Sequence, residues 1–195
     1  MIDRLSETID PVDITVLSGF LGSGKTTLIR TLLERPDLER TAVIINEFGE
    51  IGLDHELIES SEEDLVELST GCICCVMRGD LQEAIERLMV RQQTGKVFDR
   101  IILETTGLAD PGPILHSLIY NEYLKSLVRL DRVVITVDAL SGLNSIANFK
   151  ECPQQIALAD IILITKADID PTNVDDLRRE LRRINPEAFI YKSNF

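Results

Sequence analysis

Short apolar runs rich in β-branched residues alternate along the chain with segments in which apolar residues recur every three or four positions. The apolar runs predict buried strands at 13–17, 41–45, 65–68, 100–104, 133–137, 161–165 and 188–191. The second kind of segment predicts helices that start near residues 26 and 80, and further helices at 113–120, 154–159 and 173–184. Continuously apolar strands are typical of parallel sheets between helical layers. The pattern therefore predicts an α/β fold, a three-layer α/β/α sandwich with a mostly parallel sheet.

A glycine-rich segment follows the first predicted strand. Residues 19–26 read G-F-L-G-S-G-K-T and match the phosphate-loop pattern G-x-x-x-x-G-K-[ST]. Glycines let the backbone curl so that successive N–H groups point at a phosphate, and the following helix adds the positive end of its dipole. We expect Lys25 to span the β- and γ-phosphates and the Thr26 hydroxyl to ligate Mg²⁺. The alternative is a glycine-rich turn with an incidental lysine, and the strand–loop–helix context argues against it.

Two acidic segments follow other predicted strands. The segment E-T-T-G at 104–107 lies where nucleoside triphosphatases place a carboxylate toward Mg²⁺. We expect Glu104 to hold that metal through water, and the Gly107 N–H to contact the γ-phosphate in a segment that moves on hydrolysis. The segment N-E-F-G-E at 46–50 lies where a nucleotide-sensing switch would lie, with Glu47 able to reach Mg²⁺. A solvated acidic turn is the alternative interpretation of Glu47.

The segment T-K-A-D at 165–168 follows the strand predicted at 161–165. A carboxylate such as that of Asp168 can accept both guanine N1–H and N2–H₂, a donor pair that adenine lacks, while the stem of Lys166 lies along the purine face. In a phosphate-loop protein this element predicts GTP rather than ATP. Thr165 stands where asparagine is usual, and we expect weaker bracing of the loop as a result.

Three of the four cysteines lie together in S-T-G-C-I-C-C at 69–75. Glycines before and after this cluster, at 71 and 79, predict a loop. In a reducing compartment the leading interpretation is a transition-metal site made by Cys72, Cys74 and Cys75, with buried packing and redox chemistry as alternatives. Soft thiolates favour Zn²⁺ or Cu(I), with Co²⁺ and Ni²⁺ as competitors. An open fourth position, filled by Glu50, water or a client ligand, would suit a metal that must leave. Cys152 is expected to be a packing residue, with a role as fourth ligand as the alternative.

Composition limits the partners and the compartment. Lys+Arg 20 against Asp+Glu 33 gives a net charge of −13, which opposes binding to nucleic acid or to an anionic membrane. The absence of an 18-residue apolar run and of a basic-then-apolar leader predicts a cytoplasmic protein without a membrane anchor. The 195 residues suit one domain, a GTPase domain over 1–195, and leave room for a further C-terminal domain outside the chain.

The order of these motifs resembles that of the CobW-like GTPases, the cobalamin-synthesis-protein and zinc-metallochaperone family within the phosphate-loop class. The resemblance extends over about residues 12–191 and rests on G-F-L-G-S-G-K-T-T-L, I-N-E-F-G-E, G-C-I-C-C, E-T-T-G-L-A-D-P-G-P and T-K-A-D. It implies a phosphate-loop GTPase that binds a transition metal, often zinc, and passes it to a client metalloprotein. A nucleotide-dependent homodimer is an analogy from the wider class.

The resemblance also implies roles for individual residues. Phosphate contacts fall to Gly22, Ser23, Gly24, Lys25, Thr26 and Thr27. Glu47 and Glu104 lie near Mg²⁺, Lys166 and Asp168 hold the guanine, and the three clustered cysteines supply metal thiolates. In one departure, Ile45 stands where some members carry an acidic residue.

These expectations combine into a coupled mechanism. GTP with Mg²⁺ would order the segments on either side of the cysteines and change the geometry of the metal site, and the effect must be reciprocal. Hydrolysis is expected to be slow because the sequence offers no obvious arginine finger. Glu50 and Asp110 are the options for positioning the attacking water. The competing interpretations are a small-molecule kinase that uses ATP or GTP, and a non-catalytic zinc-dependent interaction module.

Overall fold

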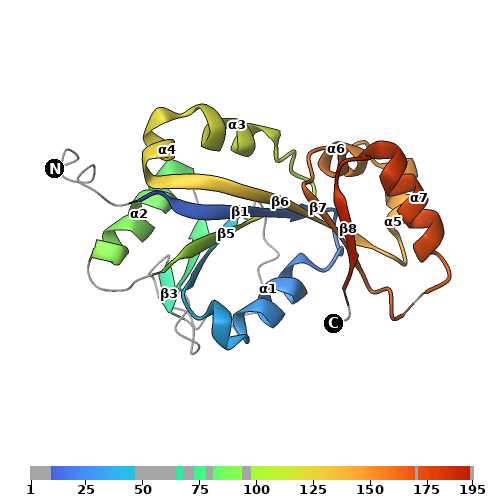
Figure 1. The fold of residues 1–195 in the computed structure, drawn as a ribbon, viewed down its shortest axis with the longest axis horizontal. Helices are drawn as coiled ribbons and strands as arrows, with labels where there is room; N and C mark the ends of the chain where they lie inside the picture. Colours follow the sequence, from blue (N-terminus) through green and yellow to red (C-terminus); the bar gives the residue numbers. More distant parts are fainter. Residues whose placement is uncertain are drawn as a thin grey trace.

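One sheet runs through the molecule and carries helices on both faces (Figure 1). The computed structural model describes residues 10–46, 65–67, 73–77, 81–93, 98–169 and 171–193. Within these ranges eight strands pair in the order β3-β4-β2-β5-β1-β6-β7-β8, all parallel except β3 with β4. Their bounds are β1 Val12–Gly19, β2 Thr41–Asn46, β3 Leu65–Glu67, β4 Ile73–Met77, β5 Arg100–Thr105, β6 Val128–Asp138, β7 Ile161–Thr165 and β8 Phe189–Lys192.

Helices connect the parallel strands and form the outer layers. They are α1 Lys25–Leu33, α2 Leu81–Gln93, α3 Gly112–Tyr120, α4 Glu122–Leu127, α5 Gly142–Asn148, α6 Glu151–Ala157 and α7 Val174–Ile184, with a short 3₁₀ turn, η2, at Pro36–Leu38. In Figure 1 helix α1 lies on one side of the sheet, and α3 and α4 lie on the other. The predicted three-layer α/β/α sandwich is therefore confirmed.

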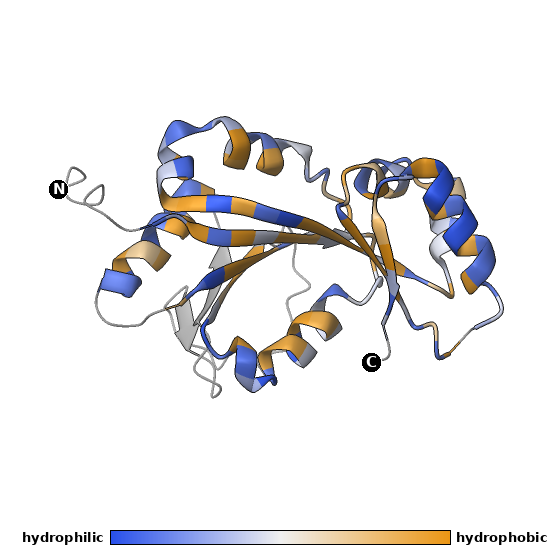
Figure 2. Ribbon diagram, viewed as in Figure 1, coloured by the Kyte–Doolittle hydropathy of each residue, from blue (hydrophilic) through white to orange (hydrophobic). Residues whose placement is uncertain are grey.

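Successive side chains of a strand point to opposite faces of the sheet, so the strands contribute to two apolar cores. On β1, Ile14 and Val16 belong to the larger core, which also receives buried residues of α2, α3, α4, α6 and α7. Leu17 belongs to the smaller core, which Leu28 and Ile29 of α1 cover. Figure 2 shows the apolar strands between these layers and the polar outer surface of α7. Burial on both faces explains the continuously apolar strand sequences.

Several elements differ from the sequence prediction, among them β6, α4 and α5. Strand β6 starts at Val128 rather than near 133, because its first half carries exposed Arg129 and Arg132, which interrupt the apolar run. Helix α4, which was not predicted, is short. It is capped at its N-terminus by Asn121, whose Oδ1 accepts hydrogen bonds from the N–H groups of Tyr123 and Leu124. Helix α5 has only 7 residues and begins at Gly142, so its pattern is too short to show a helical period. None of the helices in the described ranges is long and apolar enough to cross a bilayer.

Candidate nucleotide site and cysteine strand

The phosphate loop joins the end of β1 to the start of α1. Gly22 and Gly24 have φ angles of 69° and 92°, a left-handed backbone that glycine adopts without strain. At Gly19, which has φ 141°, an added Cβ would lie 2.4 Å from the Thr136 carbonyl oxygen. The loop closes on itself through a hydrogen bond from the Ser23 N–H to the Phe20 carbonyl, 3.1 Å long. The glycine pattern thus specifies a tight curl against β6.

Lys25 lies inside this curl and is 8% exposed. Its Nζ donates to the carbonyl oxygens of Gly19, at 2.9 Å, and Phe20, at 3.3 Å. A buried ammonium at the start of α1 adds its charge to the helix N-terminus, so both attract an anion to the same place. This is the position that the motif predicts for the lysine.

Two predicted magnesium ligands come together at the neighbouring strand end. The Thr26 hydroxyl donates to Glu104 Oε1 over 3.3 Å, which brings the first turn of α1 to the carboxyl end of β5. Glu104 is 6% exposed. A hydroxyl and a carboxylate that converge beside a phosphate loop fit the oxygen preference of Mg²⁺. Glu47 and Glu50, the other acidic residues predicted near a metal, lie outside the described residues.

The loop after β5 packs directly on the phosphate loop. Gly107 is buried, and a Cβ there would lie 2.7 Å from the Leu21 backbone nitrogen, so a side chain cannot be accommodated without displacing the loop. A turn bond from the Ala109 N–H to the Thr106 carbonyl, 3.2 Å long, shapes the segment. Asp110 accepts the Gly112 N–H at the start of α3, over 2.8 Å. The glycine predicted to sense the γ-phosphate is therefore held against the phosphate loop.

The loop after β7 also reaches the phosphate loop. Lys166, with φ 55°, donates from Nζ to the Gly22 carbonyl oxygen at 2.9 Å and to Asp138 Oδ2 at 2.5 Å. Asp138 is 5% exposed, and its other oxygen accepts the Leu140 N–H at 2.6 Å. Asp168, two residues beyond Lys166, is exposed. Sequence reasoning missed Asp138, although its place directly after the apolar end of β6 is the same signal that identified Glu104.

Thr165 braces the phosphate loop, which corrects the expectation that it would brace poorly. Its hydroxyl donates to the Ser23 carbonyl oxygen over 2.7 Å, and the residue is 2% exposed. The Ser23 hydroxyl is itself 2.6 Å from that of Thr136. The end of β7 also lies close to Gly24, where an added Cβ would be in ordinary van der Waals contact with the Thr165 methyl carbon, 3.4 Å away.

Two of the three clustered cysteines do not lie in a loop, contrary to the prediction. Cys74 and Cys75 are part of β4, where Cys74 pairs with Val43 of β2 and with Val66 of β3. The glycines that suggested a loop flank a five-residue strand. Cys72 lies outside the described residues, and the three-thiolate site stays a prediction. Within the described ranges, His, Cys, Asp and Glu form no cluster of three that could hold a metal.

Cys152 packs in the core, as predicted. It is 3% exposed in α6 and belongs to the larger apolar core. Burial raises the pKa of its thiol to about 11, so the thiol stays protonated near neutral pH. Because the thiolate is the metal-binding form, the alternative role as fourth metal ligand is disfavoured.

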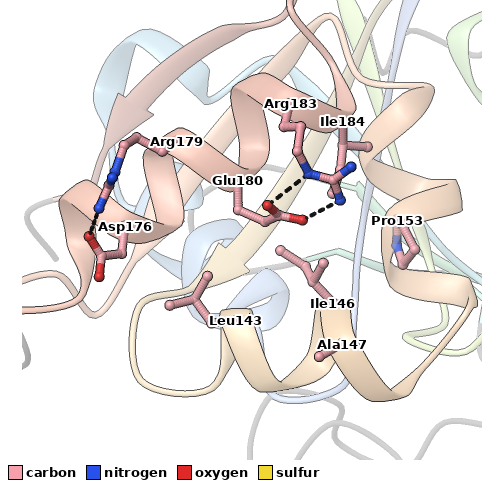
Figure 3. Close-up of a pocket in the computed structure, with 9 residues that line it drawn as sticks. All are labelled: Leu143, Ile146, Ala147, Pro153, Asp176, Arg179, Glu180, Arg183 and Ile184. Carbon is pink, nitrogen blue, oxygen red and sulfur yellow. Dashed lines mark hydrogen bonds and ion pairs between the residues drawn. The ribbon is translucent and has the colours of Figure 1, made fainter.

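A separate groove of about 580 Å³ lies between α5, α6 and α7 (Figure 3). Its floor is apolar, with Leu143 and Ile146, and its rim carries charged residues of α7 such as the ion pair of Glu180 and Arg183, 2.6 Å long. The predicted nucleotide residues do not line it. The groove therefore does not belong to the nucleotide site.

Comparisons with known proteins agree with this geometry. The family model described as CobW/HypB/UreG, nucleotide-binding domain, matches residues 13–192. The zinc chaperone YjiA of Escherichia coli (strain K12) is 39% identical over 184 residues, which is 94% of this chain and 58% of that protein. The zinc-regulated GTPase metalloprotein activator 1 of Schizosaccharomyces pombe is 37% identical over 196 residues, 96% of this chain and 47% of that protein.

Solved structures show the same relationship. The Zn(II)-bound YjiA GTPase from E. coli superposes with a TM-score of 0.78 at 36% identity, covering 95% of this chain and 58% of that one. The hydrogenase maturation factor HypB from Archaeoglobus fulgidus, at 19% identity, shares the fold with a TM-score of 0.58 over 98% of this chain and 88% of its own. The chain spans about half the length of the curated relatives it matches. With a matched family model over nearly its whole length and a phosphate loop built as the motif requires, the chain belongs to the CobW/HypB/UreG family and carries its nucleotide-binding domain.

Proposed function

We propose that this protein is a slow GTPase that binds a transition metal, zinc first, and couples its nucleotide state to delivery of that metal to a client metalloprotein. The observation that carries the proposal is the order of the strands. β4, with two cysteines, pairs with β2, and β2 pairs with β5, which carries Glu104. Cys75 is level with Ile44, and Ile44 with Leu103, so the Cys75 backbone lies about two strand spacings, roughly 10 Å, from that of Leu103, the residue before Glu104.

GTP is the nucleotide favoured by the loop after β7, which carries Lys166 and Asp168. Asp168 supplies the carboxylate for the guanine edge, and Lys166 ties that loop to the phosphate loop through Gly22. The relatives whose names include "GTPase" support the same choice. Competition between GTP and ATP separates this proposal from the small-molecule kinase, which would prefer ATP or accept both.

Hydrolysis would depend on charge placed around the γ-phosphate. Lys25 and the Gly107 N–H neutralise and orient the phosphate oxygens, while Thr26 and Glu104 hold Mg²⁺, which when bound stabilises the negative charge that develops during transfer. The sequence offers no obvious arginine finger, and such a finger is worth about 10³–10⁵ in rate. Turnover without a partner is therefore expected to be slow.

Zinc is the metal that thiolates and the relatives favour. Cys72, Cys74 and Cys75 would supply sulfur, with Glu50, water or a client ligand in the fourth position. Three of the relatives are named zinc chaperones. A YjiA triple mutant in which two cysteines and one glutamate are replaced by alanine is also described as Zn(II)-bound. Zinc bound in a crystal therefore does not identify the cysteines as ligands, and solution affinity must be measured.

The test is zinc affinity determined by chelator competition in solution, with Cys74→Ser, Cys75→Ser and Cys152→Ala compared with the wild-type protein. Loss of one thiolate is expected to weaken zinc binding at least about tenfold, because the serine hydroxyl oxygen is a harder and poorer zinc ligand than the cysteine sulfur that it replaces. Cys152→Ala is the matched control, since it removes a thiol from the core and leaves β4 unchanged. Unchanged zinc affinity in both β4 variants would refute the thiolate site, while GTP binding would remain a separate question.

A further inference from the structure

A buried amide links the loop after β5 to helix α6. Gln155 is 1% exposed, and its Nε2 donates to the carbonyl oxygens of Gly107, at 3.2 Å, and Ala109, at 3.0 Å. Both acceptors lie in the E-T-T-G-L-A segment and are 48 and 46 residues away in sequence. A single side chain thus uses both of its N–H groups to fix one short loop.

The loop in question forms part of the candidate nucleotide site. Gly107 lies against the phosphate loop so closely that an added Cβ would meet the Leu21 nitrogen, α-carbon and side chain within 3 Å. Any shift of the Gly107 carbonyl changes where the neighbouring N–H groups point. Gln155 acts on the carbonyl side of this segment, which leaves the N–H side for a phosphate.

Helix α6 contacts the phosphate loop by a second route. At its start the Cys152 N–H donates to the Phe149 carbonyl over 3.2 Å. The Phe149 ring lies 4.8 Å from that of Phe20, between centroids, and Phe20 belongs to the phosphate loop. The start of α6 is therefore anchored to one wall of the site, while Gln155 holds the other wall.

The hydrogen bonding of Gln155 is incomplete in this conformation. Among the described residues its Oε1 is a buried acceptor without a hydrogen-bond partner. Buried acceptors of this kind usually have a partner, and an exception calls for a reason. A second arrangement of residues 107–109 that offers an N–H to Oε1 would give this acceptor the partner that it lacks here, which is a reason for an unpaired acceptor beside a segment that switches.

We propose that Gln155 is a positioning residue that holds residues 107–109 in register with the γ-phosphate and so sets the preference for GTP over GDP. The inference rests on the proposed contact between the Gly107 N–H and the γ-phosphate. Gln155 itself touches neither nucleotide nor Mg²⁺. Its effect is transmitted through two backbone carbonyls.

The experiment replaces Gln155 by Met, which has a similar length and no donor, and measures affinity for GDP and for a non-hydrolysable GTP analogue. Two lost hydrogen bonds predict an analogue affinity that falls about tenfold, with GDP affinity changed less than about twofold. Backbone hydrogen exchange across 105–110 is expected to rise in the same variant. Gln155→Leu, which also has no donor, serves as a second variant and is expected to match Gln155→Met.

The control is Asn185→Leu. Asn185 is another buried amide, which donates to the Ile156 carbonyl oxygen near the C-terminal end of α6 and to the Ala159 carbonyl oxygen just beyond it, 2.9 and 3.0 Å away. Its loss should lower stability and leave the ratio of analogue to GDP affinity unchanged. Equal losses for both nucleotides in Gln155→Met, or no loss, would overturn the positioning role.

The wild-type protein separates this failure from failure of the proposed function. A wild-type preference for the analogue over GDP that Gln155→Met keeps would overturn the role of Gln155 alone. The absence of any such preference in the wild-type protein would overturn the γ-phosphate contact of Gly107, and the role of Gln155 with it.

Discussion

Two regions of the same sheet carry the candidate chemistry in different ways. The nucleotide edge, made by the carboxyl ends of β1, β5, β6 and β7, gathers its groups on loops, and each loop is tied to another by a side chain. The cysteine strand, β4, carries Cys74 and Cys75 within its ladder, between β2 and the three-residue antiparallel β3. The first region can rearrange loop by loop, whereas the backbone of the second moves only with its neighbouring strands.

This difference gives the proposed coupling a direction. A change at Glu104 or Gly107 reaches β5 first, then β2, and then the cysteine strand. β4 has one long neighbour, because β3 is only three residues long and few hydrogen bonds hold the pair at that side. Short pairings near the margin of a sheet open at lower free energy than central ones, so β4 can move together with β2 against little resistance from β3.

The largest expected effect comes from Lys25→Ala, which separates the two regions. Removal of the buried ammonium should weaken GTP binding and turnover by at least about a hundredfold, because it loses the charge at the centre of the phosphate loop. Zinc affinity without nucleotide should not change. Lys125→Ala, at an exposed lysine paired with Glu122, is the control. A Lys25→Ala variant that kept normal turnover would remove the phosphate loop from the mechanism.

A smaller effect is expected at the residues that we propose to bind the guanine base. Asp168→Ala should reduce GTP affinity by about tenfold or more and narrow the difference between GTP and ATP, because the guanine donors lose their carboxylate. Asp138→Asn should act on the same preference indirectly, since it weakens the ion pair that directs Lys166 toward Gly22. Competition binding with both nucleotides measures the two variants. An unchanged preference in Asp168→Ala would return the kinase interpretation to consideration.

Thr165→Val tests the bracing of the nucleotide edge. Valine has the same shape as threonine but cannot donate to the Ser23 carbonyl oxygen, so the free energy of unfolding should fall by about 1 kcal/mol. The loss should be larger if that buried carbonyl finds no other donor. Denaturant unfolding gives the stability, and GTP titration shows whether the loop loses affinity. No change in either would mean that the close packing at Gly24 alone holds the loop.

The smallest effect concerns pH and the core thiol. The pKa of Cys152 rises from 9.0 to about 11 in the folded state because burial disfavours the thiolate. Its contribution to stability is therefore fully present below about pH 9 and is lost as the pH rises toward 11. Cys152→Ala should flatten the decline of unfolding free energy in that window. A decline of equal slope in both proteins would contradict the assigned pKa.

The sequence predicted which strand ends come together beside the phosphate loop, because that geometry depends on local rules. Glycines at 19, 22 and 24 permit the backbone of the loop, and the residues directly after apolar strands meet at one edge. Glu104 and Lys166 were singled out in this way, and Asp138 obeys the same rule. Gln155 could not be found, because its role depends on which loop a buried helix faces, and that is decided by packing between segments 46 or more residues apart.

The cysteine cluster shows the opposite case. Gly71 and Gly79 mark ends of an element, but a turn signal does not say whether the residues between two turns form a loop or a short strand. Pairing of Cys74 with Val43, which is distant in sequence, and with the nearer Val66 decides in favour of the strand. Tertiary pairing overrides local propensity most readily in short segments.

The most direct test of the coupling is a reciprocal titration of one protein sample. Zinc affinity is measured with GDP and with a non-hydrolysable GTP analogue, and the affinities for the two nucleotides are measured with and without zinc. The predicted result is that zinc affinity differs between the two nucleotide states, and that zinc changes the ratio of the nucleotide affinities by the same factor. Equal zinc affinity in both nucleotide states would contradict coupling between the nucleotide edge and the cysteine strand.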